Sequence, residues 1–326
     1  MVDAEVFSFE DRDGEFNVFD FLGCANNGLY YDPPVNLLDL ERLLKRGVHH
    51  ASALRAKINI LKVTFVPTGY LSRSEFEKLA FNFLVTGNGY LELVRNRAGG
   101  VMRAENRLAV YMRRSSDLRD FVYLRNNWGE KFERLPGRDV VHIIEPDLRQ
   151  EIYGVPYYLA ALSSIELNSA ATKFRVRYYR NGSHAGFILY ATDDKIDEAG
   201  WALVKEQLRK AKGGGNFNNL LLRAPNGNPE GVKLIPIAEV GAKDEFLNIK
   251  GVSAEDMMAA HRVPPALMGI VPKATSGLGD AITAAKVFAR NEVAPLQQTF
   301  LDVNDRLGIE VFRFDKYVVE RTDAVA

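Results

Sequence analysis

Apolar side chains recur at helical spacing in the last third of the chain and predict two long helices there. In residues 280–307 they fall every three or four positions, at Ile282, Ala285, Ala289, Val293, Leu296, Phe300, Val303 and Leu307. This period predicts one helix with a single apolar face. Pro295 lies inside it, and because proline lacks a backbone donor and clashes with the preceding turn, we expect a kink there. Another helix is predicted at 244–262, interrupted near Gly251 and restarting at a capping residue, Ser253.

The segment between these helices, residues 270–279, is rich in proline, threonine, serine and glycine, which is typical of a loop. It comes after Val263-Pro264-Pro265, whose two prolines end the preceding helix, and after an apolar Leu267-Met268 pair. Two helices joined by a segment that cannot be helical, the second built to bend, are more typical of a moving or channel-lining part than of a catalytic pocket.

A further long helix is predicted at residues 156–180, with Pro156 in its first turn and Asn181-Gly182 as its stop. At 1.5 Å per residue this rod is roughly 36 Å long. It is rich in small residues: Ala160, Ala161, Ser163, Ser164, Ser169, Ala170 and Ala171. Because small side chains allow helices to approach closely, we expect the rod to pack beside other helices.

The last turns of this rod carry four cations. They are Lys173, Arg175, Arg177 and Arg180. Positive side chains suit the negative end of a helix dipole. A solvated helix end and a functional basic collar explain them equally well.

Shorter patterns predict an α+β domain in the first half of the chain. Helical spacing occurs at residues 37–46 and 72–83, the second with Ser72 as N-cap candidate and Glu75 at capping-box spacing. Strand-like runs follow at 90–94, 121–124 and 140–144, with a turn at 97–100. These elements predict a domain that ends in an antiparallel meander.

A small α/β insert is predicted between the long helices. Its elements are a strand at 185–190, a helix at 193–212, a glycine-rich turn at 213–216, and strands at 220–223 and 232–237. The first 36 residues are acidic and aromatic and predict an extended arm. We expect this arm to dock through Phe7, Phe9, Phe16, Phe19 and Phe21. A short strand at 309–314 and a frayed tail end the chain.

Composition narrows the functional classes. The 326 residues are 47% hydrophobic and 26% charged, which is ordinary for a folded protein of about two domains. Lys and Arg together equal Asp and Glu together, 42 each, which argues against tight DNA binding though not against weak contact. Cys24, the single cysteine, rules out an internal disulfide, favours a reducing compartment, and is interpreted as a small buried apolar residue.

No targeting or membrane signal stands out. The N-terminus is acidic and lacks the basic-then-apolar order of a signal peptide. No run approaches the roughly 18 apolar residues that a membrane span needs. We therefore expect a soluble intracellular protein.

Reactive side chains do not form a recognisable set. The five histidines show no helical pair or metal-ligand spacing, and no nucleophile elbow, Walker or dinucleotide motif is present. His142 and Glu145 form an acid–base candidate, for which simple structural use is the stronger interpretation. The run at 213–215 lacks the following Lys-Ser/Thr of a phosphate loop. The sequence predicts no catalysis, no metal and no cofactor.

Eight short runs, taken in order, resemble the portal proteins of tailed bacteriophages, and especially the PBSX-family portals of temperate, contractile-tailed phages. The runs are Tyr30-Tyr31-Asp32-Pro33-Pro34-Val35, Val48-His49-His50-Ala51-Ser52, Phe83-Leu84-Val85-Thr86-Gly87-Asn88-Gly89-Tyr90-Leu91-Glu92, His142-Ile143-Ile144-Glu145-Pro146-Asp147, Tyr153-Gly154-Val155-Pro156, Arg180-Asn181-Gly182-Ser183-His184-Ala185-Gly186, Ala260-His261-Arg262-Val263-Pro264-Pro265 and Ala289-Arg290-Asn291-Glu292. Each run alone is weak, whereas the ordered set is specific.

This resemblance implies the portal fold and its division into named parts. They are an N-terminal arm at 1–36, an α+β wing at 37–155, stem helix 1 at 156–183, an α/β clip at 184–240, stem helix 2 at 241–269, a tunnel loop at 270–279, and a kinked wing helix with a short C-terminal strand at 280–326. Because little chain follows the last helix, we expect the C-terminal crown to be reduced or absent. The residues that would face DNA in the tunnel loop are Val271, Pro272, Lys273, Ala274, Thr275, Ser276 and Gly277.

The resemblance also implies partners and a location. Copies of the chain would form a ring, typically of twelve subunits, at one vertex of the capsid of the virion. The ring would conduct double-stranded DNA without base readout, and bind the terminase large subunit, the major capsid protein and scaffold, and later a neck or tail adaptor. Assembly would take place in the host cytoplasm. Since each neutralised phosphate adds salt-dependent affinity, a neutral chain with one cation, Lys273, in its tunnel loop favours low-friction passage.

Two other functions stay open at this point. A different head-completion or adaptor protein would lack an open axial channel. A nuclease acting on phage DNA would need clustered acidic metal ligands and would cleave DNA in the presence of magnesium.

Overall fold

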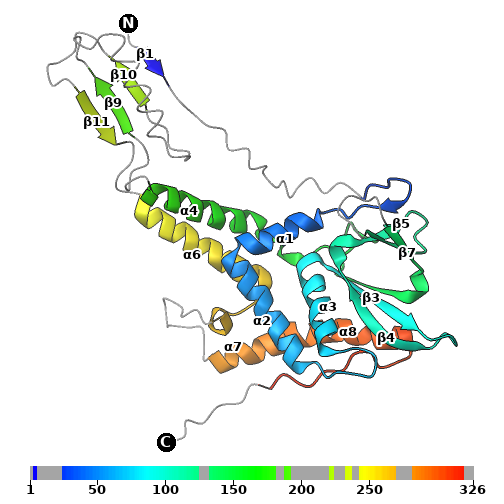
Figure 1. Ribbon diagram of the computed structural model, residues 1–326. Coiled ribbons are helices and arrows are strands. Elements are labelled where there is room, and N and C mark those ends of the chain that lie inside the picture. The colour runs from blue at the N-terminus through cyan, green and yellow to red at the C-terminus, as the bar shows by residue number, and fades with distance from the viewer. Residues whose placement is uncertain are drawn as a thin grey trace, which may run out of the picture. The chain divides into compact units, whose positions relative to one another are not determined.

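The structure, a computed structural model, divides into two compact units. It describes residues 3–5, 24–124, 132–180, 187–191, 220–223, 232–236, 242–268 and 281–318. The smaller unit comprises Met1–Phe16 and Leu167–Val252, and the larger comprises Asn17–Glu166 and Ser253–Ala326. Two long helices, α4 (Leu162–Arg180) and α6 (Ala242–His261), contribute residues to both units (Figure 1). Within the described ranges, no helix is long and apolar enough to cross a membrane.

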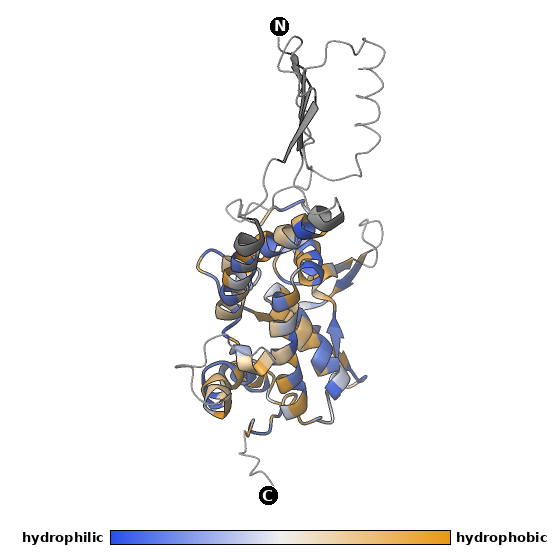
Figure 2. Cartoon of the chain, turned by 90° about the vertical axis from the view of Figure 1, so that its left-hand side faces the viewer, coloured by the Kyte–Doolittle hydropathy of each residue, from blue (hydrophilic) through white to orange (hydrophobic). Residues whose placement is uncertain are grey.

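The larger unit contains most of the helices. They are α1 (Leu37–Arg46), α2 (Val48–Thr64), α3 (Arg73–Thr86), α7 (Ala281–Phe288), the π-helical segment η5 (Ala289–Val293) and α8 (Ala294–Leu307). The predicted N-cap of α3 is confirmed, because the Ser72 side chain accepts a hydrogen bond from the backbone amide of Glu75. Figure 2 shows hydrophobic and hydrophilic residues on the same helices, as expected where one face of each packs on a core.

A core of aromatic rings joins distant parts of the sequence. Phe76 of α3 stacks on Phe65 with ring centroids 4.2 Å apart, and meets Phe300 of α8 edge-on at 5.2 Å. Phe312, beyond α8, is fully buried in the same cluster. The predicted helix at 280–307 is therefore confirmed, in three consecutive helical pieces, and its apolar face packs on α3.

Two antiparallel sheets complete the larger unit. One has the order β4-β3-β8 and the other β2-β5-β6-β7. The strands are β2 (Tyr30–Tyr31), β3 (Asn88–Arg95), β4 (Val101–Arg107), β5 (Met112–Ser115), β6 (Phe121–Leu124), β7 (Phe132–Leu135) and β8 (Val140–Ile144). Helices α3 and α8 pack against the first sheet. The predicted strands in this region are confirmed, although they belong to two sheets rather than one meander.

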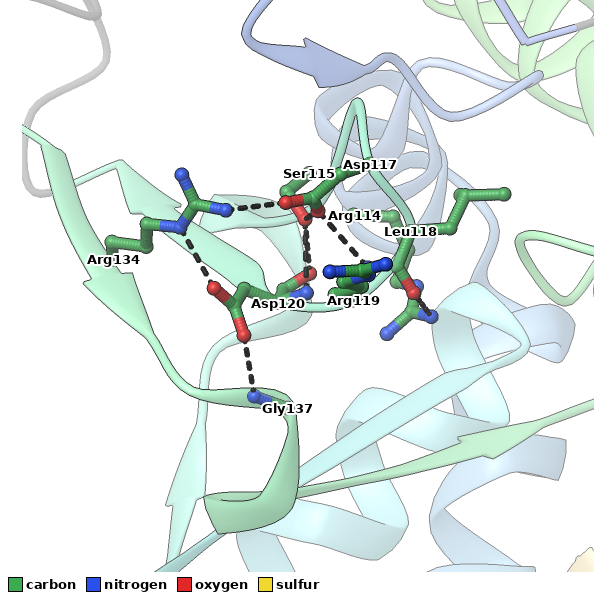
Figure 3. A network of polar contacts seen from close by, with 8 residues as sticks. All are labelled: Arg114, Ser115, Asp117, Leu118, Arg119, Asp120, Arg134 and Gly137. Carbon is green, nitrogen blue, oxygen red and sulfur yellow. Dashed lines mark hydrogen bonds and ion pairs between the residues drawn. The ribbon is translucent and has the colours of Figure 1, made fainter.

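A polar network holds the turn between β5 and β6 (Figure 3). Arg134 of β7 pairs with Asp117 at 2.6 Å and with Asp120 at 2.8 Å. Ser115 donates a hydrogen bond to the Asp117 carboxylate, and the amide of Gly137 donates one to Asp120. These donors hold the pKa of both carboxyl groups below their usual range.

The smaller unit contains a four-stranded sheet of order β1-β10-β9-β11. Its strands are β1 (Asp3–Glu5), β9 (Phe187–Ala191), β10 (Leu220–Arg223) and β11 (Val232–Pro236). The pair β10–β9 is parallel and the other pairs are antiparallel. The three predicted strands of the insert are confirmed, and β1, from the N-terminal arm, joins them unpredicted. The predicted helix at 193–212, the glycine-rich turn and the five arm phenylalanines lie outside the described residues.

Some predicted features are wrong. Helix α6 runs without interruption through Gly251, and Ser253 is buried inside it rather than capping a restart. Residues 309–314 form no strand, only an isolated bridge between Phe65 and Phe314. Helix α2 was not predicted at all. Cys24 is half-buried rather than fully enclosed, and its thiol lies 3.0 Å from the side-chain oxygen of Gln150.

Candidate functional site

Helices α4 and α6 lie side by side and are joined by polar contacts (Figure 1). In the larger unit, Ser164 Oγ donates to Asp256 Oδ2 over 2.8 Å. In the smaller unit, Asn168 Nδ2 donates to the Lys250 carbonyl over 3.3 Å, and Lys250 Nζ donates to Thr172 Oγ1 over 2.9 Å. The prediction that the first rod packs beside another helix is thus confirmed.

Helix α4 exposes apolar side chains at separate points around its surface. Leu167 is 51% exposed and Val176 is 45% exposed. Ser163 and Ala170 lie exposed on the same helix at helical spacing, with Lys173 as a charged neighbour. Leu167 and Ala170, three positions apart, share one side of the helix, whereas Val176, nine positions after Leu167, lies on the opposite side.

The predicted basic collar lies on the last turns of α4. Lys173 is exposed and Arg175 is half-buried. Arg177 and Arg180 belong to the helix, and their side chains lie outside the described part of the structure. The structure adds Lys250 of α6, whose pKa is lowered first by burial and then by Arg175. Four cations on one helix were thus predicted, and a fifth from its neighbour was not.

The predicted tunnel-loop residues, Val271 to Gly277, lie outside the described residues, and the structure describes both flanks of that segment. Upstream, α6 ends at His261 and is followed by the 3₁₀ helix η4 (Pro265–Met268). Downstream, α7 leads into η5, and Pro295 lies in the first turn of α8, where proline is tolerated. The helix irregularity therefore precedes Pro295, at residues 289–293, and the kink at Pro295 stays a prediction.

A buried ion pair connects these flanks to α2. Lys57 Nζ of α2 lies 2.5 Å from Glu292 Oε1 of η5, with 3% and 5% of the two side chains exposed. Burial lowers the pKa of Lys57, and the Glu292 carboxylate opposes that shift. Arg262, directly after α6, places its Nη1 3.6 Å from Glu292 Oε2. One carboxylate thus faces two cations from different elements.

Two further groups border this ion pair. The guanidinium of Arg262 lies over the ring of Tyr157, 5.3 Å from its centroid. Tyr157 donates a hydrogen bond to Glu145, whose pKa is raised mainly by burial. Burial, followed by the Glu145 and Glu292 charges, raises the pKa of Tyr157 to about 12. We call Lys57, Glu292, Arg262, Tyr157 and Glu145 the junction cluster.

A buried histidine pair lies at the end of α6. His50 Nδ1 of α2 and His261 Nε2 of α6 are 2.8 Å apart, and both side chains are at most 3% exposed. Tyr158 packs against both rings. Burial lowers the pKa of His50 to about 4 and is the largest cause of the lowered pKa of His261, about 2. Both imidazoles are therefore neutral near pH 7.

The Gly87-Asn88-Gly89 turn fixes the start of the rod that leads into α4. Asn88 Nδ2 donates to the Gly154 carbonyl over 2.8 Å, and its Oδ1 accepts from the Gly154 amide at 2.8 Å. Gly87 has φ of 72°, and a Cβ there would lie 2.8 Å from the backbone of Val155. Only glycine suits that position.

His142 has a structural place in the same region. Its Nε2 lies 2.9 Å from Asn88 Oδ1, and its ring stacks on Tyr90. Burial lowers the pKa of His142 to about 3. This environment supports the structural interpretation over the acid–base one. Within the described ranges, no three His, Cys, Asp or Glu side chains are placed to hold a metal ion.

A sequence model of a known family, described as phage portal protein, matches residues 61–324. The chain belongs to the phage portal protein family. This portal is 43% identical over 304 residues to the probable portal protein of Escherichia phage P2, covering 93% of this chain and 88% of that relative. It is 37% identical over 281 residues to the probable portal protein of Haemophilus phage HP1, covering 85% and 81%. It is thus a head–tail connector of a phage, and the finer PBSX assignment stays a prediction.

Solved structures share the portal fold. A chain in the virion of the native gene transfer agent particle matches with a TM-score of 0.62 at 17% identity, over 89% of this portal and 86% of that chain. A chain in the neck of that particle, computed with C12 symmetry, matches with a TM-score of 0.58 at 19% identity. The match covers 86% of this portal and 85% of that chain. The HK97-family phage portal protein from Corynebacterium diphtheriae matches with a TM-score of 0.60 at 13% identity. The match covers 85% of this portal and 94% of that chain. The α+β portal fold is therefore confirmed.

The junction cluster was missed as a site, although the portal-like runs contain most of it. Those runs include three of its five members, Glu145, Arg262 and Glu292. They lie far apart in the sequence and meet in the structure. Lys57 belongs to none of them, and the signal that would have found it is its place on the buried face of α2.

Proposed function

We propose that copies of this portal form a ring, of about twelve subunits by analogy with related necks, that conducts double-stranded DNA. The observation that carries the proposal is the match, over most of both chains, to a chain of a neck structure with C12 symmetry. A closed ring needs two different complementary surfaces on each subunit, because each copy contacts its two neighbours through different faces. In the smaller unit, α4 exposes Leu167 and Val176 on opposite sides of the helix, an arrangement that fits contacts with two different neighbours.

The parts of the portal follow from this arrangement. The larger unit is assigned to the wing, α4 and α6 to the stem, and the sheet β1-β10-β9-β11 to the clip. The clip is the docking surface for the terminase large subunit and later for the neck or tail adaptor. The wing contacts the major capsid protein and scaffold.

DNA contact in the channel is proposed to be weak and directed to phosphates. The chain carries equal numbers of acidic and basic residues, and a strongly basic bore would bind the duplex too tightly to let it slide. Lys173, Arg175 and Lys250 provide a local collar of positive charge beside the stem helices. The protein has a structural role in packaging, with no chemical step of its own.

Electron microscopy of the purified protein tests the ring. The proposal expects rings of about a dozen subunits with a central opening, and a stable monomer or dimer under all assembly conditions would contradict it. Incubation with DNA and magnesium tests the nuclease alternative, for which the expected result is intact DNA.

A deletion tests the tunnel-loop assignment. Removal of Lys273 to Gly277 is expected to leave ring formation intact and to impair DNA packaging or retention. The readout is nuclease-protected DNA in assembled particles. Unchanged packaging would remove the role proposed for this segment.

A further inference from the structure

The two flanks of residues 269–280 converge on one helix. Val263 from the upstream flank and Phe288 and Val293 from the downstream flank form a small buried cluster with Ala53 of α2. Met268 packs against the same cluster. Both ends of the intervening segment are therefore held at α2.

A shared carboxylate lies beside this apolar contact. Glu292 belongs to the downstream flank and faces Arg262 of the upstream flank at 3.6 Å and Lys57 of α2 at 2.5 Å. Along the chain, Glu292 is 30 positions from Arg262 and 235 positions from Lys57. Among the residues that the structure describes, Glu292 is the group that forms ion pairs with both α2 and the upstream flank.

Unusual backbone conformations place the charged groups there. Arg262 has φ of 54°, a left-handed conformation that turns the chain sharply at the end of α6. Glu292 lies in the π-helical segment η5, where the turn is wider than in an α-helix, and both Glu292 and Val293 are buried. Such π segments are frequently found at functional sites.

A buried ion pair of this kind fixes the arrangement of its side chains more than it stabilises the fold. A buried ion pair gains little over apolar side chains of the same size, because both charges lose their water. It does require one arrangement, since either charge alone is costly to bury. We propose that Lys57 and Glu292, with Arg262, are positioning residues that fix the two flanks of the DNA-facing segment in the portal. The proposal rests on the function proposed above.

A double substitution separates positioning from folding. Lys57→Met with Glu292→Met removes both charges and keeps similar volume, so the subunit is expected to fold, whereas each single substitution is expected to lower the folding equilibrium constant by a factor on the order of a hundred or more. The matched control is Lys62→Met with Glu77→Met. It removes a partly exposed ion pair whose lysine also lies on α2, with 2.6 Å between Lys62 Nζ and Glu77 Oε2.

Distances between spin labels report on the flanks directly. Ala266 and Lys286 are exposed, one on each flank, and accept labels through cysteines in a Cys24→Ser background, with labelled subunits diluted among unlabelled ones. We expect a narrow distance distribution in the parent and the control, and a broader one in the Lys57→Met/Glu292→Met variant. An unchanged distribution in that variant overturns the proposal.

Two smaller substitutions cover the case in which the double variant does not fold. Glu292→Gln keeps the side-chain shape, and Arg262→Gln changes a side chain that is 62% exposed. Both substitutions are expected to broaden the distribution of label distances, and Arg262→Gln is expected to broaden it less than Glu292→Gln. A parent-like distribution in both variants overturns the proposal.

Packaging provides the functional readout in the same variants. Ring assembly is expected to persist in the double variant while nuclease-protected DNA per particle falls, with the control at the parent level. A broadened distribution with parent-level packaging would overturn the functional part of the proposal. Failure of the parent itself to form rings would instead refute the proposed function, and the label distances in the subunit would still test the role of the pair.

Discussion

The larger unit of this portal is held by two kinds of buried contact, an aromatic core and a polar junction. In the core, Phe65, Phe76 and Phe300 meet ring to ring, and dispersion and burial supply the free energy. In the junction cluster, Lys57 pairs with Glu292, and a neighbouring pair, His50 and His261, is buried to a similar degree. The comparison teaches that stability and geometry come from different chemistry: the core stabilises the fold, and the junction specifies how the flanks of the DNA-facing segment are held.

The largest expected effect comes from the core. Phe76→Ala removes a fully buried ring that contacts both Phe65 and Phe300, and we expect the free energy of unfolding to fall by about 4 kcal/mol. Urea unfolding at fixed protein concentration measures this loss. The control is Phe132→Ala, because that ring is 48% exposed, and a loss there as large as at Phe76 would contradict the comparison.

The next effect comes from breaking the junction on one side. Lys57→Met leaves Glu292 buried without its main partner, and we expect a loss of about 3 kcal/mol in the free energy of unfolding. Adding Glu292→Met is expected to recover most of it. A double-mutant cycle by urea unfolding gives the coupling energy, and strictly additive losses would show that the two side chains do not act as a pair.

The histidine pair predicts a pH dependence. Because burial holds the pKa values of His50 and His261 below their usual 6.5, the unfolded chain binds more protons than the folded one as pH falls below that value. Stability is therefore fully present above pH 6.5 and is lost on acidification, by about 2 kcal/mol per histidine between pH 6.5 and pH 5. Unfolding curves measured across this range test the sign.

A variant sharpens the pH test. Replacing both rings, His50→Leu with His261→Leu, is expected to flatten the acid slope, and His142, half-buried and also with a lowered pKa, accounts for the slope that remains. A slope equal to that of the parent would assign the acid sensitivity to other groups.

The smallest effect is expected at the exposed network of Figure 3. Arg134→Gln removes a cation that pairs with Asp117 and Asp120 at the surface, where solvent and salt screen the charges. We expect thermal unfolding close to that of the parent, and salt is expected to reduce any remaining difference further. A loss comparable to that of Lys57→Met would remove the distinction between buried and exposed pairs.

Local signals predicted the elements whose buried face is apolar. Helix α3 was found because Ser72 marks its start and because its apolar residues recur at helical spacing. Helix α2 was missed although Leu54, Ile58 and Leu61 recur at helical spacing. Its buried face also carries His50, Lys57 and Thr64, which interrupt the apolar pattern. Lys57 belongs to the junction cluster and His50 to the neighbouring histidine pair, so the helix that the sequence did not predict contributes to both.

Long-range packing explains the other differences. Gly251 and Ser253 predicted a break in α6, whereas contacts with α4 along its length support a continuous helix. The partner of Lys57 lies 235 residues away, a separation that no local period reports. Of the predicted site, Lys173 and Arg175 lie on α4, and the role of the collar, like that of the tunnel-loop residues, stays a proposal.

Imaging DNA-filled particles that contain this portal tests the ring account most directly. Density for a duplex on the axis, surrounded by a ring of copies whose α4 and α6 helices line the opening, is the predicted result. A particle in which these copies enclose no opening wide enough for a double helix would contradict it.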